Sequence, residues 1–177
     1  MRKFKQLLVI VMTLSVMSIT SCSSDDDGGG PGNAPSGVLV AKVDGASYQS
    51  MEISSSATIA NNGNNLIIIA TNSDGKAFSF TIWGYEGVGT YTIGGDINIA
   101  NVASYTETDV DLNNPQNSTT EIWQAPFDDT VAGELNVSEE TETNLKGTFS
   151  FTCKNVNGDQ SIKNITDGSF DLGIQVN

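Results

Sequence analysis

The sequence predicts an all-β protein, a single antiparallel β-sandwich or barrel-like domain of about ten short strands. Apolar and polar residues alternate over short segments, which is the pattern of half-buried strands. Turn-forming pairs such as Asp44-Gly45 and Asp167-Gly168 separate these segments. No segment shows sustained helical periodicity, so helices are not expected to contribute to the core.

In the first half of the domain, turns rich in Asn, Asp and Gly delimit the strands. The predicted strands are Val38 to Val43, Ser47 to Ile53, Ala57 to Ala60 and Leu66 to Thr71. The run Leu66-Ile67-Ile68-Ile69 is apolar on both faces, which predicts a central strand.

The second half continues the alternation, with polar segments between the strands. The predicted strands are Ala77 to Tyr85, Gly89 to Ile93, Asp96 to Val102, Thr119 to Ala125, Gly133 to Ser138, Leu145 to Lys154, Ile162 to Thr166 and Ser169 to Val176. Residues 106–118 are polar and contain Pro115, which predicts a loop, and 139–144 predict an acidic turn. Asp167-Gly168 predicts a final hairpin whose second strand points Phe170, Leu172 and Ile174 inward.

The N-terminus has the composition of a secretory signal. Arg2, Lys3 and Lys5 precede an apolar stretch that is shorter than the roughly 20 residues of a membrane span. The residues Ile19-Thr20-Ser21-Cys22 resemble a bacterial lipobox, which implies removal of residues 1–21 and lipidation of Cys22. The alternative is an ordinary secretory signal with a chance cysteine.

An acidic segment follows the cysteine. Its residues Ser23, Ser24, Asp25, Asp26 and Asp27 resemble the export signal of Bacteroidota surface lipoproteins, and the alternative is a solvated linker. We therefore expect residues 22–36 to form a lipidated tether, Gly-rich from Gly28 onward, and 37–177 the all-β domain. The expected location is the outer membrane, with the domain exposed at the cell surface or, alternatively, facing the periplasm.

Two stretches carry a family resemblance. "GTYTI" and "GTFSFTCKNVNGDQSIKNITDGSFDLGI" are similar to corresponding stretches of a family of small, uncharacterised Bacteroidota surface lipoproteins. The resemblance implies the β architecture and the lipoprotein address, and it implies no catalytic residues.

Composition excludes several classes of function. The net charge of −13 would repel nucleic acid, so no nucleic-acid partner is expected. The chain contains no histidine, which excludes Ser-His-Asp and Cys-His catalysis and nearly all zinc sites that use histidine. Lipidation of Cys22 would leave Cys153 without a partner, and its alternation with Phe149 and Phe151 predicts a small buried residue, not a nucleophile.

Three aromatic residues are candidates for ligand binding. Trp83 alternates opposite to Phe78, Phe80 and Ile82, so its ring is expected to face away from the main core, and Trp123 is expected to do likewise. With Tyr85, these rings could stack on a glycan. The alternative is that they fill the second face of a sandwich or the end of a barrel.

Two further segments contain candidate sites. Asp109, Asp111 and Asn113 present oxygen atoms at alternate positions, which suggests a loose calcium loop, although Asn114 replaces the glycine of an EF-hand. A solvated loop is the alternative, and no other cofactor is expected. Asp129-Thr130-Val131 resembles a short O-glycosylation sequence of exported Bacteroidota proteins, with Thr130 as the acceptor.

These observations predict a non-catalytic, lipid-anchored binding or interaction module for a glycan or a protein ligand. The first alternative is a glycoside hydrolase that uses two carboxylates, for which Glu86, Glu121, Glu134 and the Glu139-Glu140-Glu142 cluster are available. The second alternative is an accessory subunit of an envelope complex.

Overall fold

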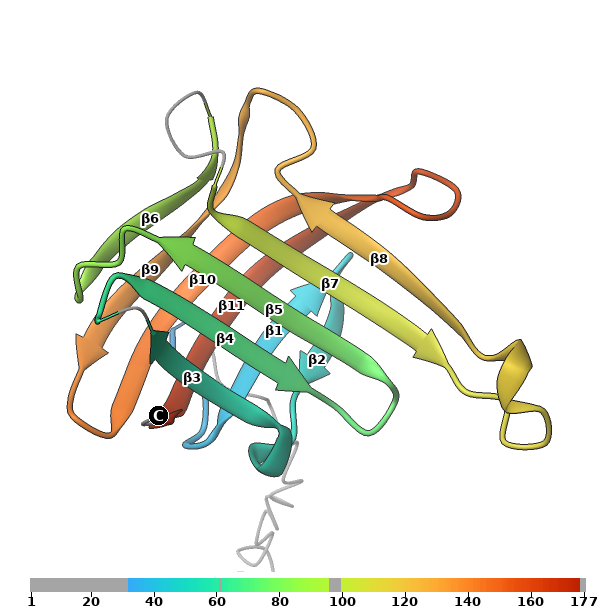
Figure 1. The fold of residues 1–177 in the computed structure, drawn as a ribbon, viewed down its shortest axis with the longest axis horizontal. Helices are drawn as coiled ribbons and strands as arrows, with labels where there is room; N and C mark the ends of the chain where they lie inside the picture. The colour runs from blue at the N-terminus through green and yellow to red at the C-terminus, as the bar shows by residue number, and fades with distance from the viewer. Residues whose placement is uncertain (1–31, 61, 96–99, 176–177) are drawn as a thin grey trace, which may run out of the picture.

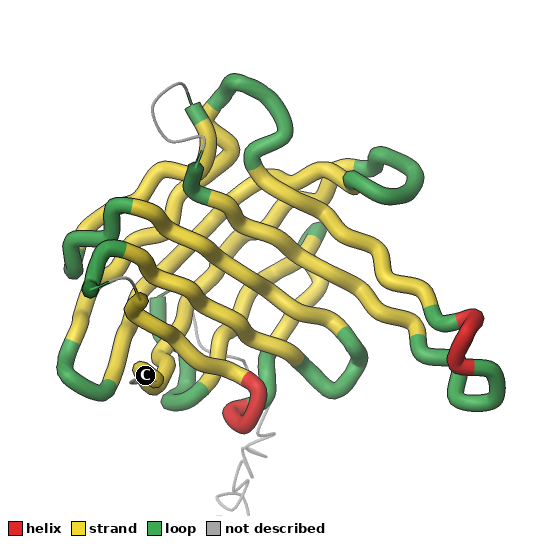
Figure 2. Tube along the Cα trace, in the orientation of Figure 1, coloured by secondary structure: helices red, strands yellow, loops and turns green. Residues whose placement is uncertain are grey.

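The computed structural model describes residues 32–60, 62–95 and 100–175, and nearly all of the regular structure is strand (Figures 1 and 2). The strands are β1 (Val38–Val43), β2 (Ala46–Gln49), β3 (Ser55–Ala60), β4 (Asn65–Thr71), β5 (Lys76–Trp83), β6 (Gly89–Gly94), β7 (Val102–Asp109), β8 (Thr119–Ala125), β9 (Val131–Glu140), β10 (Asn144–Asn155) and β11 (Ile162–Gln175). Two short 3-10 turns, η1 (Glu52–Ser54) and η2 (Pro115–Asn117), complete the described elements. The all-β prediction is confirmed.

The strands form two layers (Figure 1). The six-stranded layer has the order β2-β1-β11-β10-β9-β6, and the five-stranded layer has the order β3-β4-β5-β7-β8. Neighbours within each layer are antiparallel. The layers join at two corners, where β11 runs parallel to β3 over two residue pairs and β8 meets β10 over two more. The result is a sandwich whose two sheets are continuous at these corners.

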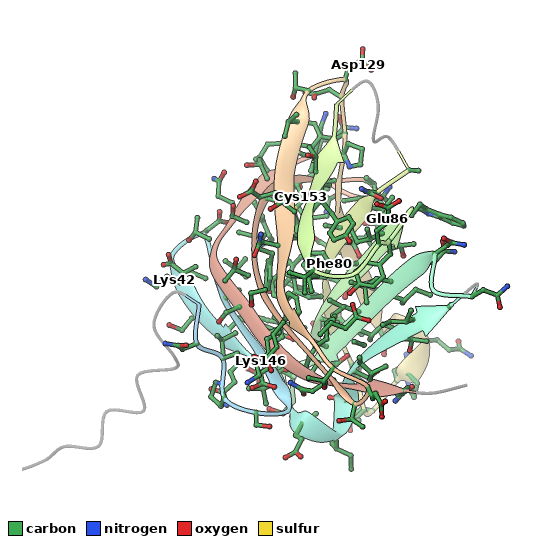
Figure 3. The ribbon with its side chains drawn as sticks, turned by 90° about the vertical axis from the view of Figure 1, so that its left-hand side faces the viewer. Lys42, Phe80, Glu86, Asp129, Lys146 and Cys153 are labelled. Atoms are coloured by element: carbon green, nitrogen blue, oxygen red, sulfur yellow. The ribbon has the colours of Figure 1, made fainter. Side chains whose placement is uncertain are left out.

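Alternation along each strand fills the space between the layers. The five-stranded layer contributes Phe78, Phe80 and Ile82, all fully buried, as the sequence predicts. The six-stranded layer faces them with Phe149 and Phe151, and the ring centroids of Phe80 and Phe149 are 4.9 Å apart in an edge-on arrangement. Figure 3 shows Phe80 and Cys153 between the layers. The burial of Cys153 is also confirmed.

The predicted final hairpin is absent, because β11 is one continuous strand through Asp167 and Gly168. Asp167 has a positive φ of 51°, and the pairing of β11 shifts register here against both neighbours, between Val40 and Lys42 on β1 and between Phe149 and Phe151 on β10. Pairing on both sides keeps the chain in the sheet, so the Asp-Gly pair forms a bulge instead of a turn. Phe170 and Leu172 are buried as predicted.

The predicted loop over 106–118 is shorter than expected, because β7 continues to Asp109. Thr106 pairs with Ala77 and Ile122, and Glu107 pairs with Lys76 and Glu121, so this polar segment completes ladders on both sides. The predicted strand Ser47 to Ile53 ends at Gln49, where η1 follows. Residues 96–99 of the predicted strand Asp96 to Val102 lie outside the described residues.

Candidate ligand-binding face

Trp83 lies at the end of β5 and points out of the sandwich. Its side chain is 53% exposed, whereas the preceding Ile82 is fully buried, so the predicted outward orientation is confirmed. In the β4–β5 ladder Trp83 stands directly opposite Asn65, which in turn pairs with Ala60 on β3. An exposed indole ring therefore has an amide side chain as its cross-strand neighbour.

Asn101 fixes the backbone of Trp83. The Trp83 N–H donates to Asn101 Oδ1 at 2.9 Å, and Asn101 Nδ2 donates to the Thr92 carbonyl oxygen on β6 at 2.9 Å. Asn101 is itself buried, so both bonds form away from bulk solvent. Asn101 is thus a positioning residue that the sequence reasoning missed, and a polar residue just before a strand gave no signal of this role.

Tyr85 is buried, so its ring is not available to stack on a ligand. Its hydroxyl donates to Glu140 Oε2 at 2.6 Å, and its ring lies 5.3 Å from that of Tyr91. Burial, with the Glu140 carboxylate as a further cause, raises the pKa of Tyr85 well above its usual value. Tyr85 supports the loop that follows Trp83.

Trp123 faces the core, so the prediction that it points outward is wrong. Its side chain is 3% exposed, and β8 pairs with β7 so that Trp123 stands opposite the inward-facing Tyr105. The indole Nε1–H donates to Ser161 Oγ at 3.0 Å, and Lys163 Nζ lies 4.3 Å from the ring centroid. Because these contacts lie inside the protein, the Trp123 ring is not available to stack on a ligand.

Among the residues that the structure describes, the outer face of the five-stranded layer, which includes Trp83, carries no charged side chain. Alternation with the buried residues identifies its outward positions among the described residues. We call this set the neutral face; its members are Ser56, Thr58, Ala60, Asn65, Ile67, Ile69, Thr71, Ala77, Ser79, Thr81, Trp83, Val102, Ser104, Thr106, Thr108, Thr120, Ile122 and Gln124. Lys154, opposite Gln124 at the β8–β10 corner, borders this face.

The outer face of the six-stranded layer has the opposite character. Lys42 pairs with Asp167 at 2.9 Å, and Lys146 pairs with Asp171 at 3.4 Å and with Glu139 at 3.8 Å. Figure 3 shows Lys42 on the outer side of this layer. The two outer faces of the sandwich therefore differ sharply in charge.

A cavity of about 260 Å³ opens at the end of the sandwich where β5 begins. Tyr105 and Lys163 both contact Glu107 Oε1 there: the tyrosine hydroxyl donates at 2.8 Å, and Lys163 Nζ lies at 3.3 Å. Burial and the bond to Glu107 raise the pKa of Tyr105 well above its usual value. A neighbouring groove is lined by Glu107, Asp109 and Glu121, so this end of the molecule is acidic.

Hydrogen bonds within the loop proposed to bind calcium account for the position of the Asp111 carboxylate. Asp111 Oδ1 accepts the backbone N–H groups of Asn113 and Asn114, each at 2.9 Å. Asp109 ends β7. Among the described residues no group of three or more His, Cys, Asp or Glu side chains is arranged to hold a metal ion. Calcium binding by Asp109, Asp111 and Asn113 stays a prediction.

Thr130 lies in the turn between β8 and β9 and is exposed. Its hydroxyl donates to Asp128 Oδ1 at 2.6 Å and its N–H donates to the same atom at 2.9 Å. Because the Thr130 side chain and backbone both donate to this carboxylate, the pKa of Asp128 is lowered. Glycosylation of Thr130 stays a prediction.

The predicted signal peptide, lipidated cysteine and export signal lie outside the described residues, and these include Cys22, Ser23, Ser24, Asp25, Asp26 and Asp27. Within the described part of the chain, no helix has the length and hydropathy needed to span a membrane.

Comparison with known proteins identifies a family. No curated protein and no solved structure matches this chain. Residues 35–172, which run from before β1 into β11, match the model of a domain of unknown function, DUF6252. The chain belongs to the DUF6252 family.

Proposed function

We propose that this protein is a non-catalytic, lipid-anchored binding module whose ligand is an uncharged glycan stacked on Trp83. The observation that carries the proposal is a half-exposed tryptophan in a face without charge. Aromatic rings offer a large apolar surface to the C–H face of a sugar ring. The neighbouring Asn65 amide supplies both a donor and an acceptor for sugar hydroxyls.

The backbone that carries Trp83 is held in place before a ligand arrives. Asn101 fixes the Trp83 backbone from one side, and the buried Tyr85 secures the loop that follows. A preorganised backbone loses less conformational entropy on binding, so more of the stacking energy appears as affinity.

The path of the chain supports an anchored arrangement. Gly37 N–H donates to the Asp171 carbonyl oxygen at 2.7 Å, and Gly32 lies against Thr148 on the outer side of the six-stranded layer. Residues 32–37 therefore lie on the side of the domain opposite Trp83. A membrane-tethered domain would then present Trp83 away from its attachment.

Affinity electrophoresis through gels that contain uncharged polysaccharides tests this proposal. Suitable polysaccharides are hydroxyethyl cellulose, starch, xyloglucan and galactomannan. We expect at least one to retard the wild type, and Trp83→Ala to weaken that binding about tenfold or more. The matched control is Phe127→Ala, which removes an exposed aromatic ring outside the neutral face. Equal retardation of Trp83→Ala and wild type would contradict the proposal.

A carboxylate-dependent glycoside hydrolase is the second candidate. Glu107 and Glu121 stand opposite each other in the β7–β8 ladder and both line the acidic groove. A hydrolase would release new reducing ends from one of the polysaccharides above, and Glu121→Gln would abolish the release. If the polysaccharide is still intact after prolonged incubation with the wild type, the hydrolase candidate is wrong and binding is the remaining function.

A further inference from the structure

The neutral face continues well beyond Trp83, and apolar and hydroxyl side chains lie in separate rows along its strands. From the Trp83–Asn65 pair, the outward positions of β4 are Ile67 and then Ile69, whose side chain is 50% exposed. Thr81 stands beside Ile67 and Ser79 beside Ile69 on β5. On the other side, β3 places Thr58 beside Ile67 and Ser56 beside Ile69. An apolar strip thus lies between two rows of hydroxyl groups.

We infer that this strip binds a linear, uncharged polysaccharide that runs along β4 from Trp83 to Ile69. The inference rests on the proposed function and extends it from one sugar ring to a chain. The distance from Asn65 to Ile69 along an extended strand is about 13 Å, so one ring cannot contact both ends. The C–H faces of successive sugars would lie on Trp83, Ile67 and Ile69, and their hydroxyls would bond the Ser and Thr rows.

Charge favours this occupant. The chain has a net charge of −13, and the six-stranded layer carries ion pairs on its outer face, yet the neutral face has neither acids nor bases. A polyanion would find no cation in the strip and would be repelled by the rest of the protein. A polycation would find no carboxylate there. An uncharged polymer needs neither a cation nor a carboxylate in the strip, and the negative charge of the protein does not repel it.

The composition of the strip argues against a protein partner. The centres of protein interfaces are enriched in aromatic residues, Met and Arg and depleted in Ser. The neutral face has one aromatic residue at its end, contains neither Met nor Arg, and is rich in Ser and Thr. Its aliphatic side chains are separated by hydroxyls, which suits a ligand that alternates C–H faces and hydroxyl groups.

Isothermal titration with hexasaccharides of β-1,4-glucose, α-1,4-glucose and β-1,4-mannose, and with glucose and mannose, tests the inference. We expect a hexasaccharide to bind at least tenfold more tightly than its monosaccharide. Ser79→Lys places a charge beside Ile69 in the strip, and Ser150→Lys makes the same change on the outer face of the six-stranded layer. Ser79→Lys should lower hexasaccharide affinity at least tenfold, Ser150→Lys should leave it unchanged, and circular dichroism should show both variants folded.

The outcomes separate this inference from the proposed function. If the wild type binds hexasaccharide and monosaccharide with equal affinity, and only Trp83→Ala weakens that binding, the inference about the strip is wrong and the Trp83 site stands. If the wild type binds none of the sugars, both proposals fail. Sedimentation that shows a dimer dissociated by Ser79→Lys but not by Ser150→Lys would mean that a second copy covers the strip, which would overturn the inference.

Discussion

At the scale of single residues, the surroundings of Cys153 decide its chemistry. The side chain is fully buried, and its Sγ donates to the Lys163 carbonyl oxygen at 3.6 Å. Burial is the main cause that raises the pKa of the Cys153 thiol from 9.0 to about 12, and the Asp44 charge adds to the shift. Because the thiolate is the reactive form, the thiol should be inert in the folded protein.

We therefore predict that Cys153 resists a thiol reagent in the native protein at pH 9 and reacts once urea unfolds it. Below about pH 9 the Cys153 thiol is protonated in both the folded and the unfolded protein, so its titration does not change the free energy of unfolding there. Above that pH the unfolded chain loses the proton first, so the free energy of unfolding should fall by up to about 1.4 kcal/mol per pH unit. Urea titrations of wild type and Cys153→Ala should show a shallower decline in the variant. Identical declines would contradict the assigned pKa shift.

At the scale of elements, β11 shows where local sequence signals are overridden. Asp167-Gly168 has the composition of a hairpin turn, and Asp167 adopts the positive φ that such a turn uses. The chain nevertheless continues, because β1 and β10 pair with β11 on both sides of this point. The Phe149 ring packs onto Gly168, where a Cβ atom would lie 2.5 Å from its Cδ2. Sequence alternation predicted the burial of Phe170 and Leu172, but it could not predict which neighbouring strands hold the bulge in place.

Two glycines of β11 make a matched pair for testing this bulge. Gly168→Ala should lower the free energy of unfolding by about 1–3 kcal/mol, because a methyl group there clashes with the Phe149 ring and its backbone oxygen. Gly173→Ala should have a much smaller effect, since the nearest atom to its Cβ position is the Thr143 carbonyl oxygen at 4.0 Å. Urea unfolding of both variants measures the difference. Equal destabilisation would contradict the close packing at Gly168.

At the scale of the whole molecule, the sandwich has one charged and one neutral outer face. Alternation within β5 predicted that Phe78, Phe80 and Ile82 point inward, and it predicted the outward orientation of Trp83. It could not predict the neutral face, because that face depends on which strands are neighbours. β6 leaves the sequential order and pairs with β9, so β7 takes the place beside β5 and continues the face. Such long-range pairing leaves no local signal.

The Leu66–Ile69 run illustrates the same limit. Residues apolar on both faces predicted a central strand, and β4 does have a neighbour on each side. The second apolar face, however, is not covered, since Ile69 is 50% exposed. Exposed aliphatic residues on a central strand fit a ligand surface better than a core.

An uncharged glycan that binds along the neutral face should leave the rest of the molecule untouched. Backbone amide chemical shifts, recorded by nuclear magnetic resonance while a binding hexasaccharide is titrated in, test it most directly. We expect shifts concentrated at Asn65–Ile69, Ser79–Trp83 and Ser56–Ala60, with none at Lys146, Asp171 or the cavity around Lys163. Shifts concentrated at Glu107, Glu121 and Lys163 with the neutral face unchanged would contradict it.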